Sequence, residues 1–407
     1  MMRRSIRMKK GACMLIVLCL LVTLLAGIAA AEGAAAQVPE LTIKRREIPD
    51  NEAMAFLKSI GVGWNLGNTF DAIKGDWNRK ADEMTVETSW VGVKTTEAMI
   101  EAIQNAGFTA IRVPVSWHDH VDENNQISEK WLNRVQEVVD WIYNRGMHVI
   151  LNIHHDEDQF LPTPEHKEAS AQYVKAIWTQ LAERFQDYDD LLIMESMNEP
   201  RMVGHANEWR FDANNADCVS AAGVLNELNQ LFVDTVRASG GNNATRYLMV
   251  PGYDAAPDSV LNDFFVLPKD TADNKLIVSV HAYTPYSFAL EMPGTDSFGT
   301  QSQKQEIVSF MNGLYDKYIK NGIPVVIGEF GAMVKGDNLQ SRVDWTAFYA
   351  ATAGARNLPV FWWDNNVFSG NGERFGLLDR KTLSFPHQQI VDALMRYGGY
   401  EKLPEAK

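Results

Sequence analysis

The chain has 407 residues, of which 46% are hydrophobic and 22% are charged. These proportions are typical of a globular protein and exclude a disordered chain. The formal net charge is −14, which argues against a nucleic-acid partner because the phosphate backbone would be repelled.

The first 31 residues have the pattern of a secretory signal peptide. An apolar run over residues 11–31 ends in the small residues Ala29-Ala30-Ala31, and it follows five cationic residues, Arg3, Arg4, Arg7, Lys9 and Lys10. A membrane anchor is the alternative, since about 20 apolar residues can span a bilayer. The small residues and the lack of a cationic stop-transfer flank favour cleavage, and 34–36 offers a second cleavage site. We therefore expect a secreted protein without a membrane attachment, whose net charge changes from −14 to −19 when the five cations leave.

The rest of the chain shows no low-complexity linker and indicates a single domain. We divide the sequence into a signal peptide (1–31), a lead-in (32–49), a catalytic domain (50–400) and a C-terminal tail (401–407). Only one cysteine, Cys218, follows the signal, so neither an internal disulfide nor a cysteine zinc site can form.

Short β-branched segments alternate with longer segments of helical periodicity along the whole domain. The eight predicted strands are 61–68, 108–117, 148–155, 191–200, 246–253, 275–283, 324–331 and 359–366. The predicted helices are 95–105, 129–145, 167–185, 219–238, 303–320, 340–355 and 386–397, with a short one near 256–264 and one capped by Asp50 and ending at Ser59. Eight such units predict an α/β protein with a single (β/α)8 TIM barrel. A dinucleotide-binding sheet is disfavoured because the third glycine of GxGxxG is missing after Gly61.

The predicted strands end in polar and aromatic residues, at the C-terminal side where barrel enzymes carry their active sites. They occur on seven of the eight strands: Asn65 and Asn68, Arg112 and Trp117-His118, His154-His155-Asp156, Asn198-Glu199, His281 and Tyr283, Glu329, and Trp362-Trp363-Asp364. Burying polar groups costs free energy unless they are paired. Such repetition at one end of a barrel indicates an active site.

Glu199 and Glu329 lie at the ends of predicted strands four and seven, on opposite sides of the barrel opening. Two opposed glutamates suit glycoside hydrolysis, in which one donates a proton and the other acts as nucleophile or base. The surroundings of the acid are expected to raise its pKa, whereas Arg112 and Tyr283 could keep the other carboxylate ionised. The amide of Asn198 could bind a sugar 2-hydroxyl.

These residues lie in motifs that resemble those of glycoside hydrolase family 5. The motifs are 63–69 (GWNLGNT), 111–115 (IRVPV), 198–200 (NEP), 281–283 (HAY), 328–331 (GEFG) and 362–364 (WWD). They occur in the strand order of the family and cover about residues 50–400. Within the family, the sequence is most similar to secreted bacterial endo-β-1,4-glucanases (cellulases).

The resemblance implies specific roles. Glu199 would be the general acid/base and Glu329 the nucleophile of a retaining enzyme, with the two carboxyl groups about 5 to 5.5 Å apart. The implied supporting set is Arg112, His154 (preferred over His155), Asn198, His281, Tyr283 and Trp363 (preferred over Trp362), to which we add Asn65 and Trp117 from the strand ends. No cofactor and no metal are expected, the partner would be a β-glucan chain, and the protein would be a monomer.

Several alternatives remain open. A metal-dependent hydrolase could use His154-His155-Asp156, although HxH spacing is absent, and a non-catalytic carbohydrate-binding barrel would not need both glutamates. The substrate could be xyloglucan, mixed-linkage glucan, mannan or xylan, since specificity would depend on the loops 157–165, 201–217, 284–302 and 369–384. Tryptophans in predicted loops above the barrel (Trp77, Trp90, Trp117 and Trp209) could form sugar subsites, whereas those at helical spacing (Trp131, Trp141, Trp178 and Trp345) are expected to pack.

Overall fold

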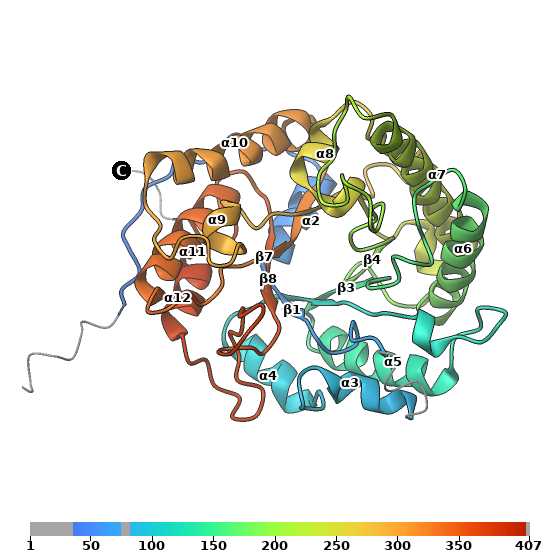
Figure 1. Ribbon diagram of the computed structural model, residues 1–407, viewed down its shortest axis with the longest axis horizontal. Helices are drawn as coiled ribbons and strands as arrows, with labels where there is room; N and C mark the ends of the chain where they lie inside the picture. Colours follow the sequence, from blue (N-terminus) through green and yellow to red (C-terminus); the bar gives the residue numbers. More distant parts are fainter. Residues whose placement is uncertain (1–35, 75–81, 404–407) are drawn as a thin grey trace, which may run out of the picture. The chain divides into compact units, whose positions relative to one another are not determined.

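The computed structural model describes residues 36–74 and 82–403 (Figure 1). The chain divides into two compact units, Met1–Gln37 and Val38–Lys407, and the barrel belongs to the second. The predicted signal peptide lies outside the described residues. Within the described ranges, no helix is both long enough and apolar enough to cross a membrane.

Eight parallel strands form a closed barrel in sequence order, with β1 paired to both β2 and β8. The strands are β1 (Val62–Leu66), β2 (Ala110–Val113), β3 (His148–Asn152), β4 (Leu192–Glu195), β5 (Leu248–Pro251), β6 (Leu276–His281), β7 (Val325–Phe330) and β8 (Val360–Asp364). Each predicted strand is confirmed, and each is shorter than predicted. Asn65, Arg112, His281, Glu329 and Trp363 lie within the observed strands, whereas His154, Glu199 and Tyr283 lie in the loops that follow them. The predicted (β/α)8 barrel is therefore confirmed.

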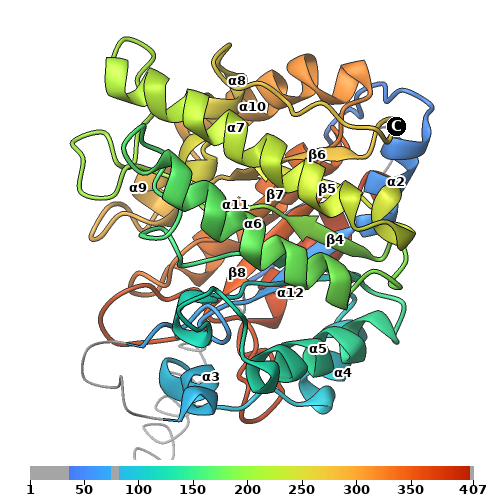
Figure 2. The same ribbon diagram turned by 90° about the vertical axis from the view of Figure 1, so that its right-hand side faces the viewer.

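Helices surround the strands, with α6 and α7 along the outside in the turned view (Figure 2). The α-helices are α2 (Glu52–Ile60), α3 (Val86–Ser89), α4 (Glu97–Asn105), α5 (Glu129–Tyr143), α6 (Lys167–Arg184), α7 (Ala216–Ala238), α8 (Pro257–Leu261), α9 (Tyr286–Ala289), α10 (Gln301–Lys317), α11 (Leu339–Gly354) and α12 (Gln388–Tyr397). Short 3-10 helices are η2 (Glu83–Thr85), η3 (His118–His120), η4 (Gly241–Ala244), η5 (Tyr253–Ala255) and η6 (Ile319–Asn321).

All nine predicted helices are present, and α3 and α9 are additional. A four-residue helix makes a single turn and has no apolar periodicity by which the sequence could reveal it. The prediction that Asp50 caps the first helix is wrong: Asn51 is the cap, and its Oδ1 accepts a hydrogen bond of 2.8 Å from the N–H of Met54.

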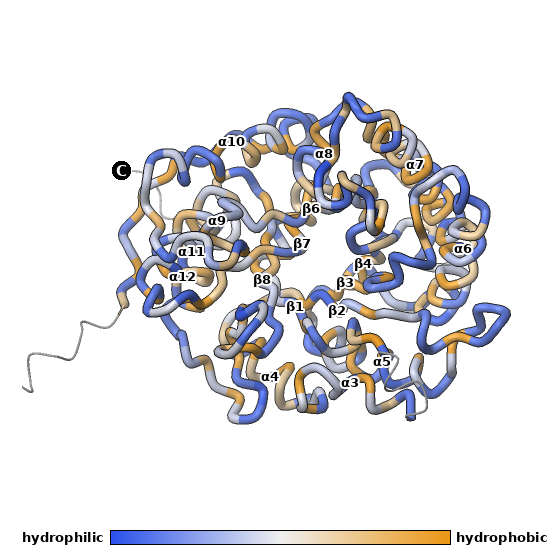
Figure 3. Tube along the Cα trace, viewed as in Figure 1, coloured by the Kyte–Doolittle hydropathy of each residue, from blue (hydrophilic) through white to orange (hydrophobic). Residues whose placement is uncertain are grey.

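The core lies on the strands and on the helix faces that cover them, where hydrophobic residues concentrate (Figure 3). Every residue of the eight strands is buried. Three tryptophans predicted to pack, Trp131, Trp178 and Trp345, are fully buried. The core therefore forms a rigid support for the loops above the strands.

The lead-in is attached to the last helices of the barrel. The Tyr397 hydroxyl in α12 donates to the Pro39 carbonyl (2.6 Å) and accepts from the Leu41 N–H (2.9 Å). The Arg46 N–H donates to the Ala355 carbonyl at the end of α11 (2.8 Å). The beginning of the described chain is thus fastened to its last helices.

Candidate active site

Glu199 and Glu329 line one cleft of about 910 Å³ above the strands. Eight of the predicted site residues line this cleft: His154, His155, Asn198, Glu199, His281, Tyr283, Glu329 and Trp363. The other three, Asn65, Arg112 and Trp117, are fully buried and do not line it. The fold thus brings the predicted residues together, some in the cleft and some beneath it.

The carboxylate of Glu329 is held by two donors. Arg112 Nη1 donates to Oε1 at 2.6 Å, and the hydroxyl of Tyr283 donates to Oε2 at 2.9 Å. Both contacts agree with the sequence-based prediction. A carboxylate with a guanidinium and a hydroxyl donor on its two oxygens is stabilised in its charged form, as a nucleophile requires.

Arg112 connects Glu329 to the neighbouring strands. Its Nη2 donates to Oδ1 of Asn198 (2.8 Å), its Nη1 also donates to Oδ1 of Asn65 (3.1 Å), and its Nε donates to Oε2 of Glu195 (2.7 Å). Burial disfavours the charged guanidinium, but the charges of Glu195 and Glu329 outweigh this and raise the pKa of Arg112. Arg112 is therefore a buried cation whose guanidinium group positions Asn198 as well as Glu329.

Sequence reasoning missed Glu195. Its buried carboxylate accepts hydrogen bonds from Arg112 Nε, from Asn152 Nδ2 (3.0 Å) and from the Ser279 hydroxyl (2.6 Å). The available signal was a charged residue in the otherwise apolar strand β4, since such a residue must be paired inside the barrel. Glu195 lies in the middle of the predicted strand 191–200, although it is the last residue of the observed β4, and the prediction rests on residues at the predicted strand ends.

Glu199 is paired with His281. Nδ1 of His281 lies 2.7 Å from Oε1 of Glu199. Burial raises the pKa of Glu199, but the hydrogen bond from His281 and the charge of Arg201 outweigh burial, and the pKa lies below its ordinary value. The expectation that the surroundings raise this pKa is therefore wrong for the free protein.

The two glutamates approach each other closely. One carboxylate oxygen of Glu199 and one of Glu329 lie within 4.8 Å of each other and of a His281 ring nitrogen. Inverting glycosidases separate their carboxyl groups by about 6.5 to 9.5 Å to leave room for a water molecule, whereas retaining ones have about 5 to 5.5 Å. The spacing is on the retaining side of this division.

The strand-eight tryptophans face opposite ways, as alternation along a strand requires. Trp363 lines the cleft and stacks on His154, with ring centroids 5.7 Å apart and planes inclined by 3°. Trp362 is fully buried and donates from Nε1 to the Phe375 carbonyl. Both His154 and His155 line the cleft, so the structure does not single out one of them as the histidine that contacts the sugar.

The loop tryptophans differ in exposure. Trp117 is fully buried and donates from Nε1 to the Asn152 carbonyl (2.9 Å), so the idea that it forms a sugar surface is wrong. Trp90 and Trp209 line the cleft, and Trp209 is 60% exposed. One face of Trp209 covers the guanidinium of Arg201, with Cζ 3.9 Å from the ring centroid. Trp77 lies outside the described residues.

The arrangement does not favour the metal-hydrolase alternative. Asp156 accepts hydrogen bonds from the Trp117 N–H, the Tyr173 hydroxyl and Nδ1 of His118, and is thus engaged away from His154 and His155. A different trio, Asp71, His154 and His155, has ligand atoms within 4.8 Å of one another. However, Asp71 already accepts from two backbone N–H groups (2.8 and 2.6 Å).

His155 also disfavours a cation at this trio. Burial lowers its pKa, but a hydrogen bond to Glu157 outweighs burial and the pKa rises to about 9. A metal ion requires neutral imidazole, whereas this ring is protonated at neutral pH.

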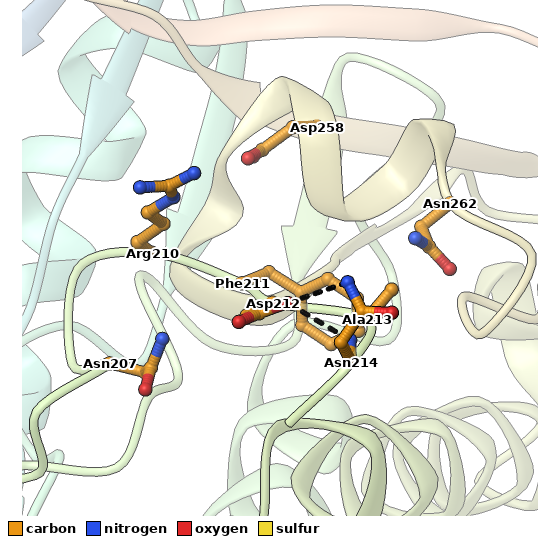
Figure 4. Close-up of a pocket in the computed structure, with 8 residues that line it drawn as sticks. All are labelled: Asn207, Arg210, Phe211, Asp212, Ala213, Asn214, Asp258 and Asn262. Carbon is orange, nitrogen blue, oxygen red and sulfur yellow. Dashed lines mark hydrogen bonds between the residues drawn. The ribbon is translucent and has the colours of Figure 1, made fainter. Parts of the chain in front are cut away.

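A second cavity of about 480 Å³ is formed by the loops after β4 and β5 (Figure 4). Its lining is polar, with Arg210 and Asp258 at one side and Asn262 at the other, and Asp212 accepts two hydrogen bonds from Asn214. It is about half as large as the cleft and contains neither glutamate. The chemistry therefore belongs to the cleft.

Comparison with known proteins agrees with this geometry. Residues 76–369 match the family model "Cellulase (glycosyl hydrolase family 5)". The chain is 39% identical over 374 residues to Endoglucanase B of Ruminococcus albus, which covers 90% of this chain and 87% of the relative. It is 43% identical over 363 residues to Cellulase/esterase CelE of Acetivibrio thermocellus; this match covers 88% of the chain but only 42% of the length of that relative.

Among solved structures, a glycoside hydrolase 5 lichenase from Caldicellulosiruptor sp. F32 in complex with cellotetraose is 51% identical. The two superpose with a TM-score of 0.87, over 89% of this chain and 99% of the lichenase chain. The family model matches residues 76–369, and the match to Endoglucanase B covers 87% of that relative. Both lead to the same assignment. The chain belongs to glycosyl hydrolase family 5, the cellulase family.

Proposed function

We propose that the protein is a secreted, endo-acting, retaining β-glucanase that hydrolyses internal β-1,4-glucosidic bonds of cellulose-type glucans. The observation that carries the proposal is the close pair of glutamates, one of which is held by Arg112 and Tyr283. In this proposal Glu329 is the nucleophile and Glu199 is the general acid/base.

Two displacements complete the reaction. Glu329 attacks the anomeric carbon while Glu199 protonates the departing glycosidic oxygen, which leaves a glycosyl-enzyme ester. Glu199 then takes a proton from a water molecule, and this water attacks the same carbon and releases Glu329. Oδ1 of Asn198 is engaged by Arg112, so its Nδ2 is the group that can donate to the sugar 2-hydroxyl.

Two tryptophans of the cleft, Trp363 and Trp209, support an endo mode of attack. Trp363 is packed against Met333 and Phe375 beside Glu329, and Trp209 lies on Arg201, whose Nη1 donates to the carbonyl of Glu199 (2.9 Å). Indole faces of this kind can stack on sugar rings. A chain could thus extend in both directions from the cleaved bond.

The substrate class follows from the relatives. Those compared above are an endoglucanase, a cellulase/esterase and a lichenase that binds cellotetraose. We place cellulose-type glucan first and mixed-linkage glucan second, with xyloglucan, mannan and xylan as further candidates. Secretion after cleavage of residues 1–31, the domain division given above and a monomeric state are part of the same proposal.

The test is a product profile on carboxymethyl cellulose, lichenan, xyloglucan, mannan and xylan. Wild-type protein is compared with Glu199→Ala and Glu329→Ala. We expect rapid loss of viscosity on the first two substrates and a loss of at least about 10²-fold in either variant. Full activity of Glu329→Gln on β-glucan would refute the catalytic assignment and revive the non-catalytic binding alternative.

A further inference from the structure

Asp254 lies beside the proposed acid/base but has no role in the mechanism above. It follows β5, within η5, and it lines the same cleft as Glu199. Its backbone N–H donates to the carbonyl of Pro200, the residue after Glu199, at 2.9 Å. The segment that carries Asp254 is thereby tied directly to the segment that carries Glu199.

The backbone at this point is strained. Asp254 has a φ of 56° and Ala255 has a φ of 45°, so two successive non-glycine residues adopt the left-handed conformation. Such conformations persist where the surrounding structure holds them, and they cluster at functional sites. In this conformation Asp254 lines the cleft.

The carboxyl group of Asp254 accepts no hydrogen bond from any described residue. Other buried carboxylates of this protein are well paired, such as Asp156 with its backbone, tyrosine and histidine donors, or Asp364 with the N–H groups of Leu377 and Leu378. A half-buried carboxyl without a donor faces a large free-energy cost if it is ionised.

The charges around it favour the protonated form. Burial and then the charge of Glu199 raise the pKa of Asp254 to about 9, with Asp258 and Glu208 acting in the same direction. Arg201 is the cation that opposes them, and it is already paired with Glu157 and Glu208. The pKa of Glu199 also depends on the charges of His281, Arg201 and Glu157. His281 in turn interacts with the charge of Glu329.

We propose that Asp254 is a positioning residue for the general acid: Asp254 and Glu199 form a carboxyl pair that retains one proton, and this proton is available to Glu199 when the glycosidic oxygen arrives. The inference rests on the proposed function. It explains how a glutamate that is ionised in the free protein, beside His281, can deliver a proton during catalysis.

The proton balance is simple. The O–H bond of Asp254 breaks and an O–H bond forms on Glu199, while the negative charge moves from Glu199 to Asp254. Glu199 then gives this proton to the leaving oxygen. In the second displacement Glu199 accepts a proton from water, which restores the single proton of the pair. No oxidant or reductant takes part.

The test compares Asp254→Asn with Asp258→Asn, which removes an exposed carboxyl from α8 nearby. Two substrates are used: cellotetraose, whose leaving group needs a proton, and 2,4-dinitrophenyl β-cellobioside, whose leaving group does not. Asparagine tolerates the left-handed conformation, so the backbone is preserved. If Asp254→Asn does not fold, Asp254→Gly is measured in the same way, because glycine also adopts this conformation freely.

We expect Asp254→Asn to lower kcat/KM for cellotetraose by about 10- to 100-fold, within the range of general-acid effects, and to change it less than about 3-fold for the aryl substrate. The basic limb of the pH profile for cellotetraose should move to lower pH, because the proton then resides on Glu199 alone, whose pKa lies below its ordinary value. Asp258→Asn should change kcat/KM less than about 3-fold for either substrate, because Asp258 acts on Asp254 only through its charge and less strongly than Glu199 does.

Equal losses on both substrates, or an unchanged pH profile, would overturn the inference and leave a structural role for Asp254. These results differ from a failure of the proposed function, in which Glu199→Ala and Glu329→Ala would retain activity.

Discussion

Replacing Arg112 by methionine is expected to lower both the stability and the activity of the protein. Methionine has a similar length but no charge, so the buried carboxylates of Glu195 and Glu329 lose the guanidinium that lies 2.7 and 2.6 Å from them. Breaking a buried ion pair by removing one partner costs about 3 to 5 kcal/mol. The entropy of unfolding is about 2.1 cal/mol/K per residue, which for the unit Val38–Lys407 makes this loss a fall in Tm of about 4 to 6 °C.

The loss of stability should depend on pH in a defined direction. Without the guanidinium, no cation offsets the cost of keeping the two buried carboxyl groups ionised. Because higher pH favours the ionised form of a carboxyl group, the stability of the variant relative to wild type should fall as the pH rises from 5 to 8. Thermal unfolding at several pH values measures this trend.

Arg134→Met is the matched control. Arg134 forms a buried pair with Glu87 (Nη2 to Oε1, 2.7 Å) between α5 and α3, outside the cleft. We expect a similar fall in Tm but normal kcat, whereas Arg112→Met should lose about 10²- to 10³-fold in kcat because the charged form of Glu329 is no longer held. A variant of Arg112 that keeps its Tm within about 1 °C of wild type at pH 7, or keeps its kcat, would refute this reasoning.

Three further predictions concern other parts of the barrel. Trp209→Ala should raise KM for long glucan chains several-fold, with little change in hydrolysis of the aryl cellobioside, as initial rates would show; equal changes on both would contradict a role in chain binding. Trp117→Ala should lower the free energy of unfolding by about 3 to 5 kcal/mol, measured by urea denaturation, because a fully buried indole leaves a cavity. Burial lowers the pKa of His148 to about 4, so the native state resists protonation that the unfolded state accepts below about pH 6.5. Wild type should therefore lose about 3 kcal/mol between pH 6.5 and 4 that His148→Gln does not lose, and parallel pH curves would contradict this.

The sequence was sufficient to predict the barrel and most of the cleft. The apolar strands end in polar residues, and the C-terminal ends of all strands lie at the same end of the barrel. This arrangement brings Glu199, His281 and Glu329 together independently of the loop conformations. The alternation of side chains along β8 likewise directs Trp363 into the cleft and Trp362 into the core.

The remaining features depend on information that the pattern does not contain. Trp117 was misplaced because β2 ends at Val113, and strand alternation says nothing about residues beyond it. Asp254 lies in a turn before α8, where an aspartate usually serves as a cap. Its left-handed conformation and the pairing of its N–H with Pro200 arise only from tertiary contacts.

The lead-in also affects how the protein tolerates proteases. Chain ends are the usual places where local unfolding and cleavage begin. Here the lead-in binds α12 through Pro39 and Leu41, and Arg45 Nη2 donates to the Leu403 carbonyl (2.6 Å), so the two ends of the domain protect each other. Both candidate signal cleavage sites precede Pro39, and processing at either one would leave this mutual protection intact.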